Sequence, residues 1–486
     1  MYRPDLWLYG GVSSVLFVLT HVYAVAWWLY IPAILLLCLG VTQVRTTRGA
    51  FCFGWLVGSC KAAAAIIWIW NTYPIDWLGS LSVSMQLLII GLYWVVTSIV
   101  IGLGVAVFAV LYHYIRVRPI LYAAIPVAWI IGEVAGSFLF SLYSWGAGSV
   151  PNTHFSFGYI GYQIVDLNWV LPWAHAGGVY ALSFLAWCLV GVVWLLLQQQ
   201  YRNVLGLVGL IGVSTVCFSI PYTPDVTNVS SASVFVVDTQ FAPHMFLDAD
   251  GFATKQQEVI RASIAAIEKA PDYIVLPEDA RLTDGFPSPM VALAFLQQYS
   301  TTTVVIDTAR TRDQSGDTVL RAYIYDTAQS EVYTVDKQYL VPQGEFVPYL
   351  HGFVLSHLTK PAWYEGVQQS QSYRPGSRIS YDEIPDTIPA VLFCMESSSG
   401  FAAKQLSNRQ AMPFMAHPVS HAWFHNDFVL TFALDRMLRT QSVWANVPVV
   451  KAGNMSQGSV YDPKGVQHEG ILHEQAALWR VVEYRL

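Results

Sequence analysis

The distribution of apolar side chains divides the 486-residue chain into two parts of different character. In the first part, long apolar stretches lie at residues 6–23, 25–42, 51–70, 84–112, 119–140, 174–197 and 203–220. Most of them are long enough to cross a hydrocarbon core of about 30 Å at 1.5 Å per helical residue. The pattern predicts seven membrane-spanning helices. The first two stretches are so close together that a helical hairpin that does not fully cross remains an alternative.

The second part alternates short strand-like runs with amphipathic helical stretches. Runs rich in β-branched and aromatic residues lie at 233–238, 273–276, 302–307, 322–325, 332–335, 390–393 and 447–450. Helical patterns lie between them, for example at 252–269 and 427–445. This alternation favours a layered α/β sandwich. We therefore expect a transmembrane domain at 1–220, a linker at 221–232, an α/β catalytic domain at 233–470 and a C-terminal tail at 471–486.

Charge supports the division and predicts an orientation. Residues 1–220 contain only seven Lys or Arg and four Asp or Glu. The basic residues fall at the start of the chain and in every second loop: Arg3, Arg45, Arg48, Arg116, Arg118 and Arg202. This positive-inside pattern predicts a cytoplasmic N-terminus and, after seven crossings, an extracytoplasmic α/β domain. The N-terminal residues show no small-residue cleavage pattern, so we expect no cleavable signal peptide.

Two charged residues interrupt the apolar stretches. Lys61 lies in the third stretch and Glu133 in the fifth, where a charge facing lipid is costly. Each lies beside a Gly-xxx-Gly pattern that permits close helix approach, Gly54 with Gly58 and Gly132 with Gly136. Their similar depth allows an ion pair that holds the bundle together. A contact between Glu133 and the substrate is the alternative.

Cys394 is the only cysteine after residue 220, and it follows the apolar run at 388–393. A lone thiol at a strand end is a candidate nucleophile, although most free cysteines are small buried hydrophobic residues. Glu278 and Lys337 follow two other strand-like runs. A thiol needs a base to remove its proton, and attack on a carbonyl creates an oxyanion that a cation stabilises. The three residues together therefore predict a Glu-Lys-Cys site, while each alone is compatible with a solvated surface charge or a buried thiol.

Three sequence blocks resemble those of the nitrilase, or carbon–nitrogen hydrolase, superfamily. They are Leu-Pro-Glu ending at Glu278, the block from Lys337 through Leu-Val-Pro-Gln-Gly-Glu345, and Phe-Cys-Met-Glu ending at Glu396. The middle block and the apolar first half resemble the apolipoprotein N-acyltransferase family in particular. The resemblance implies a nitrilase-like α-β-β-α sandwich in which Glu278, Lys337 and Cys394 act as the triad. Glu345 would support Lys337, and Glu396 would shape the nucleophile loop.

The chain also departs from that family's pattern. Met395 follows the nucleophile where the family usually has Tyr, and His421 precedes the Ala-Trp-Phe block that contains Trp423 and Phe424. These positions are expected to line the substrate pocket, so the departures bear on donor or acceptor preference. Residues 471–486 are too short and too charged for the last transmembrane helix that the family normally has.

The resemblance implies a function and its partners. The donor would be a membrane phospholipid, the acceptor a diacylglyceryl lipoprotein, and the enzyme a monomer in the bacterial inner membrane with its site on the periplasmic side. Phe346 and Trp363 lie in apolar segments that are candidates for a membrane-facing lid. A membrane-tethered amidase that uses the same triad, and a non-catalytic assembly or transport protein, are the alternatives.

Other function classes have little support. The chain has no phosphate-binding glycine motif and no basic stripe, and its net charge is −6, so no nucleotide or nucleic-acid partner is expected. His417, His421 and His425 recur every four residues, the spacing of metal ligands on a helix, but Pro418 breaks a helix there. We expect no metal and no cofactor.

Overall fold

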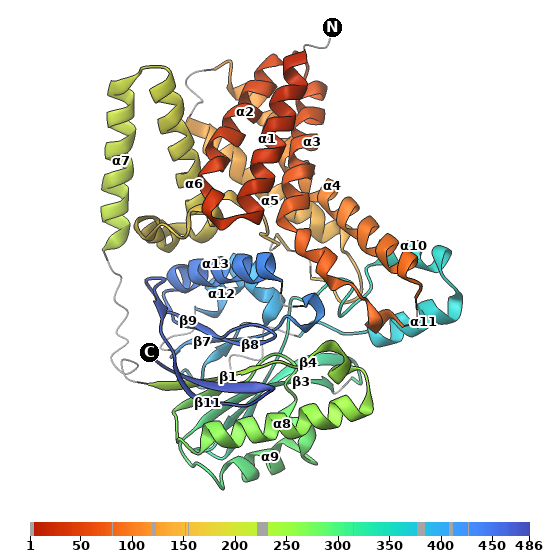
Figure 1. Cartoon of the computed structure of the whole chain (residues 1–486). Helices are drawn as coiled ribbons and strands as arrows, with labels where there is room; N and C mark the ends of the chain where they lie inside the picture. The colour runs from red at the N-terminus through yellow and green to blue at the C-terminus, as the bar shows by residue number, and fades with distance from the viewer. Residues whose placement is uncertain are drawn as a thin grey trace.

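Seven long helices form a bundle above an α/β domain in the computed structural model (Figure 1). The structure describes residues 4–79, 81–118, 123–150, 152–153, 155–220, 232–313, 315–376, 384–407, 412–425 and 427–486. The long helices of the bundle are α1 (Pro4–Val22), α2 (Tyr30–Gln43), α3 (Thr47–Ala65), α4 (Val83–Ile115), α5 (Ile125–Tyr143), α6 (Leu171–Leu197) and α7 (Tyr201–Ser219). Each predicted apolar stretch therefore overlaps one of these helices.

Within the described residues, five helical segments are long and apolar enough to cross a membrane: Ala24–Gln43, Val83–Ile115, Ile125–Tyr143, Asn168–Leu197 and Tyr201–Ser219. The apolar part of α1, Leu6–Val22, is shorter. Helix α3 carries Arg48 and Lys61 and is not among the five. The chain thus has a membrane part.

The predicted glycine contacts hold α3, α4 and α5 together. A Cβ atom on Gly58 of α3 would lie 2.4 Å from the carbonyl oxygen of Gly102 in α4. A Cβ atom on Gly132 of α5 would lie 2.6 Å from the carbonyl oxygen of Gly104. Because only glycine lets these backbones approach so closely, the two patterns are interfaces between helices.

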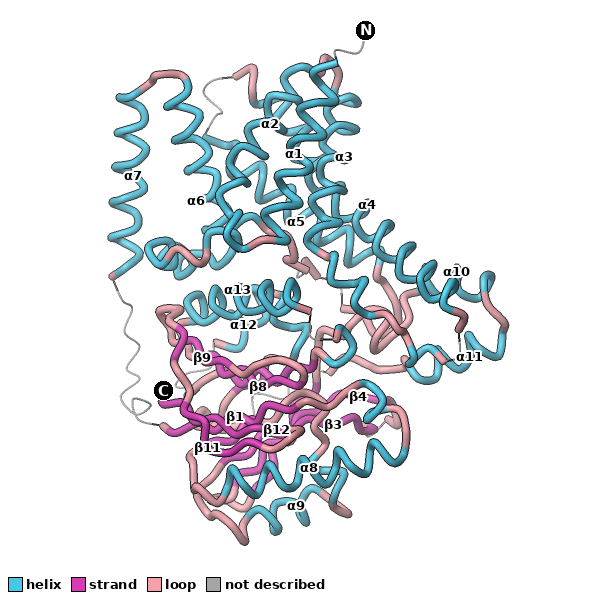
Figure 2. The backbone as a smooth tube through the Cα atoms, in the orientation of Figure 1, coloured by secondary structure: helices cyan, strands magenta, loops and turns pink. Residues whose placement is uncertain are grey.

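The second part is one twelve-stranded sheet, bent where β8 pairs with β1 through a single residue pair (Figure 2). The strands are β1 (Ser233–Thr239), β2 (Tyr273–Val275), β3 (Val304–Arg312), β4 (Thr318–Asp326), β5 (Glu331–Asp336), β6 (Ala390–Val391), β7 (Met415–Ser420), β8 (Val449–Asn454), β9 (Ser459–Tyr461), β10 (Gln467–His468), β11 (Ile471–Gln475) and β12 (Trp479–Arg485). Val234 and Val236 of β1 share a core with Val391 and Val450, so the two halves of the sheet face each other.

Helices cover both outer faces of the folded sheet. Helices α8 (Ala249–Ile267) and α9 (Pro289–Leu296) pack on the half that contains β1 to β4. Helices α12 (Gly400–Leu406) and α13 (Phe428–Ala445) pack on the other half. They lie between the sheet and the bundle, and Leu430 and Leu434 of α13 belong to the same core as the bundle side chains (Figure 1). The layers therefore follow an α-β-β-α order.

The segment 471–486 is part of the sheet and not a tail beside it. Strand β12 pairs antiparallel with β1 along its whole length, from Ser233 with Arg485 to Thr239 with Trp479. Its apolar residues alternate: Val481 faces the core under α8, and Val482 faces the core between the two halves of the sheet. The predicted C-terminal tail is therefore wrong as a description of 471–486: its charged residues lie between buried ones, and Arg480 pairs with the buried Asp238 at 2.8 Å.

Candidate active site

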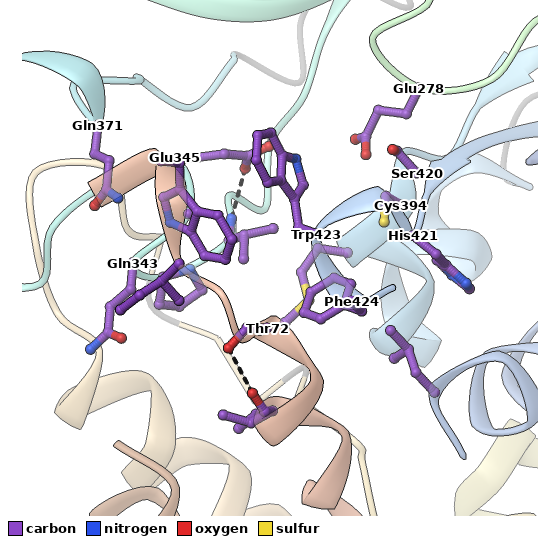
Figure 3. A pocket seen from close by; sticks show the side chains of 18 of the residues that line it. Thr72, Glu278, Gln343, Glu345, Gln371, Cys394, Ser420, His421, Trp423 and Phe424 are labelled. Carbon is purple, nitrogen blue, oxygen red and sulfur yellow. Dashed lines mark hydrogen bonds between the residues drawn. The ribbon is translucent and has the colours of Figure 1, made fainter. Parts of the chain in front are cut away.

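Three strand ends bring the predicted triad together. Glu278 follows β2, Lys337 follows β5, and Cys394 begins a short 3-10 helix, η10 (Cys394–Ser398), just after β6. The Nζ of Lys337 donates a hydrogen bond to Oε1 of Glu278 at 3.0 Å. Both Glu278 and Cys394 line one cavity, and their side chains project toward it in Figure 3. A carboxylate, an ammonium group and a thiol thus meet at one point.

Glu345 holds the ammonium group from the other side. Its Oε1 accepts a hydrogen bond from Lys337 Nζ at 2.7 Å, and its Oε2 accepts one from the backbone N–H of Val341 at 2.7 Å. The Lys337 side chain is fully buried. A buried ammonium group between two carboxylates has little freedom to move, so its position relative to Glu278 is fixed.

Glu396 joins the segment after Lys337 to the turn that carries the thiol. Its Oε1 accepts hydrogen bonds from the backbone N–H groups of Gln338 at 2.8 Å and Tyr339 at 3.3 Å. Its Oε2 accepts one from the N–H of Phe393 at 2.9 Å. One buried carboxylate thereby sets the spacing between the cation and the thiol.

Burial or neighbouring charges raise the pKa values of Glu278, Lys337 and Cys394. Burial raises the pKa of Glu278 to about 7, against the opposing effect of Lys337. The pKa of Lys337 is raised because the Glu278 and Glu345 carboxylates outweigh its burial. Burial and the Glu278 charge raise the pKa of Cys394 well above its usual value, while Lys337 and a backbone hydrogen bond from Ser420 oppose the shift. The resting thiol is therefore protonated, next to a carboxylate that can accept a proton near neutral pH.

The cavity extends from this polar end into the helical bundle. Its volume is about 310 Å³, and most of its wall is aromatic or aliphatic. Side chains of the bundle and its loops line the far part: Trp68, Trp77, Ile90, Tyr93, Phe140 and Phe157. An apolar cavity of this kind accepts a hydrocarbon group next to the thiol.

Four of the predicted pocket residues line this cavity: Met395, His421, Trp423 and Phe424. Trp423 packs edge-on against Trp77, with ring centroids 5.0 Å apart, and Phe424 packs in the same way against Trp68 at 5.2 Å. Burial lowers the pKa of His421 to about 3, so its ring is neutral. These side chains join the α/β domain to the bundle at the cavity wall.

The two lid candidates and Glu133, which were also predicted to contact the substrate, lie elsewhere. Phe346 is buried against Gly148 beside a separate cavity of about 50 Å³. Trp363, in α11 (Pro361–Ser370), donates its indole N–H to the carbonyl oxygen of Leu78 at 2.5 Å. Glu133 lies inside the bundle, outside the wall of the main cavity. Their apolar or intramembrane sequence contexts do not reveal which surface they face.

The predicted ion pair between Lys61 and Glu133 is absent, although both residues are described and both line one small cavity of about 20 Å³. The Lys61 ammonium group donates to the carbonyl oxygen of Gly158. Glu133 accepts hydrogen bonds from the N–H of Ile160 and the hydroxyl of Ser183, each at 2.8 Å. Both charges are used by the loop that follows α5, which sequence spacing alone does not indicate.

The three histidines at four-residue spacing do not converge. His417 lies within β7, and its Nδ1 is 2.6 Å from the carbonyl oxygen of Leu392. His421 follows that strand, and His425 has a left-handed backbone with Nδ1 2.8 Å from the carbonyl oxygen of Asn71. Across the described ranges, no three His, Cys, Asp or Glu side chains are grouped as metal ligands.

Sequence reasoning missed three polar residues that line the cavity: Asp279, Arg310 and Gln371. Asp279 follows Glu278 with a left-handed φ of 59° and pairs with Arg310 at 3.0 Å. Gln371 also lines the cavity and lies across from Cys394 in Figure 3. The adjacency of Asp279 to Glu278 was the one available signal, whereas Arg310 and Gln371 come from distant segments.

Comparisons with known proteins give one relative along the chain and several similar folds. No family model matches the chain. The match to an amidase from Nesterenkonia sp. covers 53% of this chain and 92% of the amidase chain, with 14% sequence identity and a TM-score of 0.34. The match to a carbon–nitrogen hydrolase from Helicobacter pylori covers 51% of this chain and 88% of the hydrolase chain, with 10% sequence identity and a TM-score of 0.35. Over 448 residues, 88% of this chain and 78% of the relative, the chain has a homologue at 25% identity that is named Apolipoprotein N-acyltransferase, from Allorhizobium ampelinum.

Proposed function

We propose that this protein is a membrane N-acyltransferase that moves a fatty acyl chain from a phospholipid to the N-terminal amine of a diacylglyceryl-cysteine lipoprotein. The observation that carries the proposal is the cavity of about 310 Å³ that connects Cys394 with aromatic side chains of the helical bundle. An acyl chain needs such an apolar wall next to the nucleophile, whereas a small soluble amide does not.

In the first half of the reaction, Cys394 attacks an ester carbonyl of the phospholipid. Glu278 accepts the thiol proton as the carbon–sulfur bond forms, and the Lys337 ammonium and the Met395 N–H stabilise the oxyanion. When the carbon–oxygen bond of the ester breaks, Glu278 returns the proton to the leaving oxygen. The products are an acyl thioester on Cys394 and a lysophospholipid.

In the second half, the lipoprotein amine attacks the thioester. Glu278 accepts a proton from the attacking nitrogen, the carbon–sulfur bond breaks, and the thiolate of Cys394 recovers that proton. The products are an N-acylated lipoprotein and the original thiol. The proton balance closes within the site, so the scheme needs no cofactor.

Both substrates are anchored in lipid, which suits a site under a membrane bundle. We propose that all seven long helices cross the bacterial inner membrane, with the N-terminus in the cytoplasm and the α/β domain on the periplasmic face. The distribution of basic residues supports this orientation. Single cysteines placed at Thr47 and at the exposed Ser330, in a variant without native cysteines, should react with an impermeant maleimide from opposite faces. Labelling of both from outside would reject the seven-span topology.

The mechanism predicts an intermediate that can be weighed. Protein incubated with phospholipid alone should gain the mass of one acyl chain on the Cys394 peptide, and hydroxylamine should remove it. A diacylglyceryl-cysteinyl peptide should discharge it and become N-acylated. Glu278→Gln should fail to load because its amide cannot accept the thiol proton. Turnover of a soluble amide without any adduct from lipid would reject the acyltransferase in favour of a membrane-tethered amidase.

A further inference from the structure

The segment 155–164 lies between the helical bundle and the turn that carries Cys394. It includes the 3-10 helix η5 (Ile160–Ile164), and all five residues of η5 are buried. Phe155 and Phe157 from the same segment line the main cavity. This segment, called the bridging loop below, therefore touches both the membrane part and the site.

On the bundle side, Glu133 holds the bridging loop by its backbone. One carboxylate oxygen accepts the N–H of Ile160 at 2.8 Å, and the other accepts the hydroxyl of Ser183 at 2.8 Å. The same Ser183 oxygen accepts the N–H of Gly161 at 3.1 Å. Two consecutive backbone donors of the loop are thus satisfied by α5 and α6.

Lys61 binds the bridging loop at Gly158, shortly before the residues that Glu133 and Ser183 hold. Its ammonium group donates to the carbonyl oxygen of Gly158, which has a left-handed φ of 84°. A Cβ at this position would lie 2.8 Å from Ala65 Cβ and 3.7 Å from Lys61 Nζ. The conformation and the space both require glycine, so the lysine contacts a defined turn and not a loose coil.

On the site side, the bridging loop contacts the nucleophile turn directly. The backbone N–H and the hydroxyl of Ser156 both donate to the carbonyl oxygen of Ser398, at 3.2 and 2.5 Å. The Ser398 hydroxyl in turn donates to the carbonyl oxygen of Met395 at 2.8 Å. The Met395 peptide adjoins the thiol, so a shift of Ser156 is transmitted to Cys394 through two hydrogen bonds.

We propose that Glu133 and Lys61 are positioning residues: they fix the bridging loop, which sets the turn of Cys394 and one wall of the acyl cavity. Buried charges in a membrane bundle are costly, and apolar side chains would pack α3 and α5 together equally well. These two charges form no ion pair with each other and bind loop backbone instead. The catalytic consequence rests on the proposed acyl transfer, while the positioning can be measured without it.

The decisive variants are Glu133→Leu and Glu133→Gln in the full chain. Leucine removes both acceptor oxygens, whereas glutamine retains one oxygen for Ile160 and offers an N–H to the Ser183 oxygen. Ser13→Ala is a matched control, since it removes a buried bundle hydrogen bond to the carbonyl oxygen of Ala33. Thermal unfolding in detergent measures the general loss of stability in all three.

Two readouts separate positioning from stability. In folded Glu133→Leu, amide hydrogen exchange should accelerate in the peptides that cover 155–164 and 393–400, and not in α8. The maximal rate at which phospholipid loads Cys394 should fall about tenfold, while the lipid concentration that gives half of this rate should change less. Glu133→Gln and Ser13→Ala should remain close to the wild type in both readouts. If Glu133→Leu does not fold, Ser183→Ala and Ser156→Ala are measured in its place.

Each outcome is decisive. Unchanged exchange at 393–400 in the folded variant would overturn the inference, and so would undiminished loading when the wild type loads. If the wild type loads no lipid at all, the proposed function fails. Faster exchange at 393–400 in Glu133→Leu would then still support the positioning of the Cys394 turn.

Discussion

Replacing Glu396 by glutamine is the sharpest test of how the nucleophile is held. The side chain keeps its shape, but one carboxylate oxygen becomes an N–H₂ group. In the wild type, one oxygen accepts from Gln338 and Tyr339, and the other accepts from Phe393. Glutamine therefore cannot satisfy all three backbone donors in either orientation of its amide.

The loss of stability in Glu396→Gln follows from the orientation of the glutamine amide that leaves fewer backbone donors unsatisfied. With the amide oxygen toward Gln338 and Tyr339, the amide nitrogen faces the N–H of Phe393, and two donors oppose each other. A buried donor without an acceptor costs about 1–3 kcal/mol, so we expect the free energy of unfolding to fall by about 2 kcal/mol. Because Phe393 directly precedes the thiol, a displaced backbone there should also slow acyl loading about tenfold.

The assay compares loading per folded molecule. Purified Glu396→Gln and wild type are incubated with phospholipid, and the acyl adduct on the Cys394 peptide is followed by mass spectrometry alongside thermal unfolding. Glu365→Gln, an exposed change in α11, serves as the control and should alter neither quantity. Loading of folded Glu396→Gln at the wild-type rate would refute the argument that this carboxylate sets the position of the thiol.

Three further predictions concern the same site. The rate of acyl loading should fall as the pH is lowered through about 7. Burial raises the pKa of Glu278 to about 7, and a protonated carboxyl group cannot accept the thiol proton. An equal rate at about pH 5 and about pH 8 would contradict this prediction. Glu345→Gln should lower loading by about tenfold, because it removes a charge beside the lysine ammonium and one amide oxygen cannot accept from both Lys337 and the Val341 N–H. Lipid affinity should change less than loading, and a pure loss of affinity would be inconsistent with this reasoning. Trp423→Ala should raise the share of the Cys394 thioester that is lost to water, because it removes the contact with Trp77 at the cavity wall. The measured quantity is free fatty acid relative to N-acylated peptide, and an unchanged ratio would count against the idea that Trp423 keeps water from the thioester.

The sequence drew attention to the three candidate residues because strand ends leave a local signal. Glu278, Lys337 and Cys394 each follow an apolar run, and residues just after strands gather at one edge of a sheet. The structure brings Glu278 and Lys337 into hydrogen-bond contact and places Glu278 and Cys394 on one cavity wall. The seven apolar stretches were equally accessible, since a helix in lipid has to be apolar along its length.

Contacts between distant segments left no such signal. Ser156 and Ser398 are 242 positions apart, and neither lies in a periodic pattern that would relate the two. Lys61 and Glu133 were predicted to pair because sequence gives depth in the bundle, but depth does not tell which backbone groups need a partner. The segment 471–486 was misassigned because its charges were conspicuous and its alternation of buried residues was short.

The proposed reaction explains why a helical bundle would belong to the site. In that reaction, a thioester on Cys394 has to survive until a lipid-anchored amine arrives, so water has to be kept from Cys394 while the charges stay fixed. Lys337 is fully buried between its two carboxylates, and the Trp77–Trp423 and Trp68–Phe424 contacts cover the cavity from the bundle side. The same aromatic side chains line the apolar cavity that receives the acyl chain in the proposed reaction. The position of Glu278, Lys337 and Cys394 beside this apolar wall therefore supports the proposed acyl transfer over the alternative of a membrane-tethered amidase.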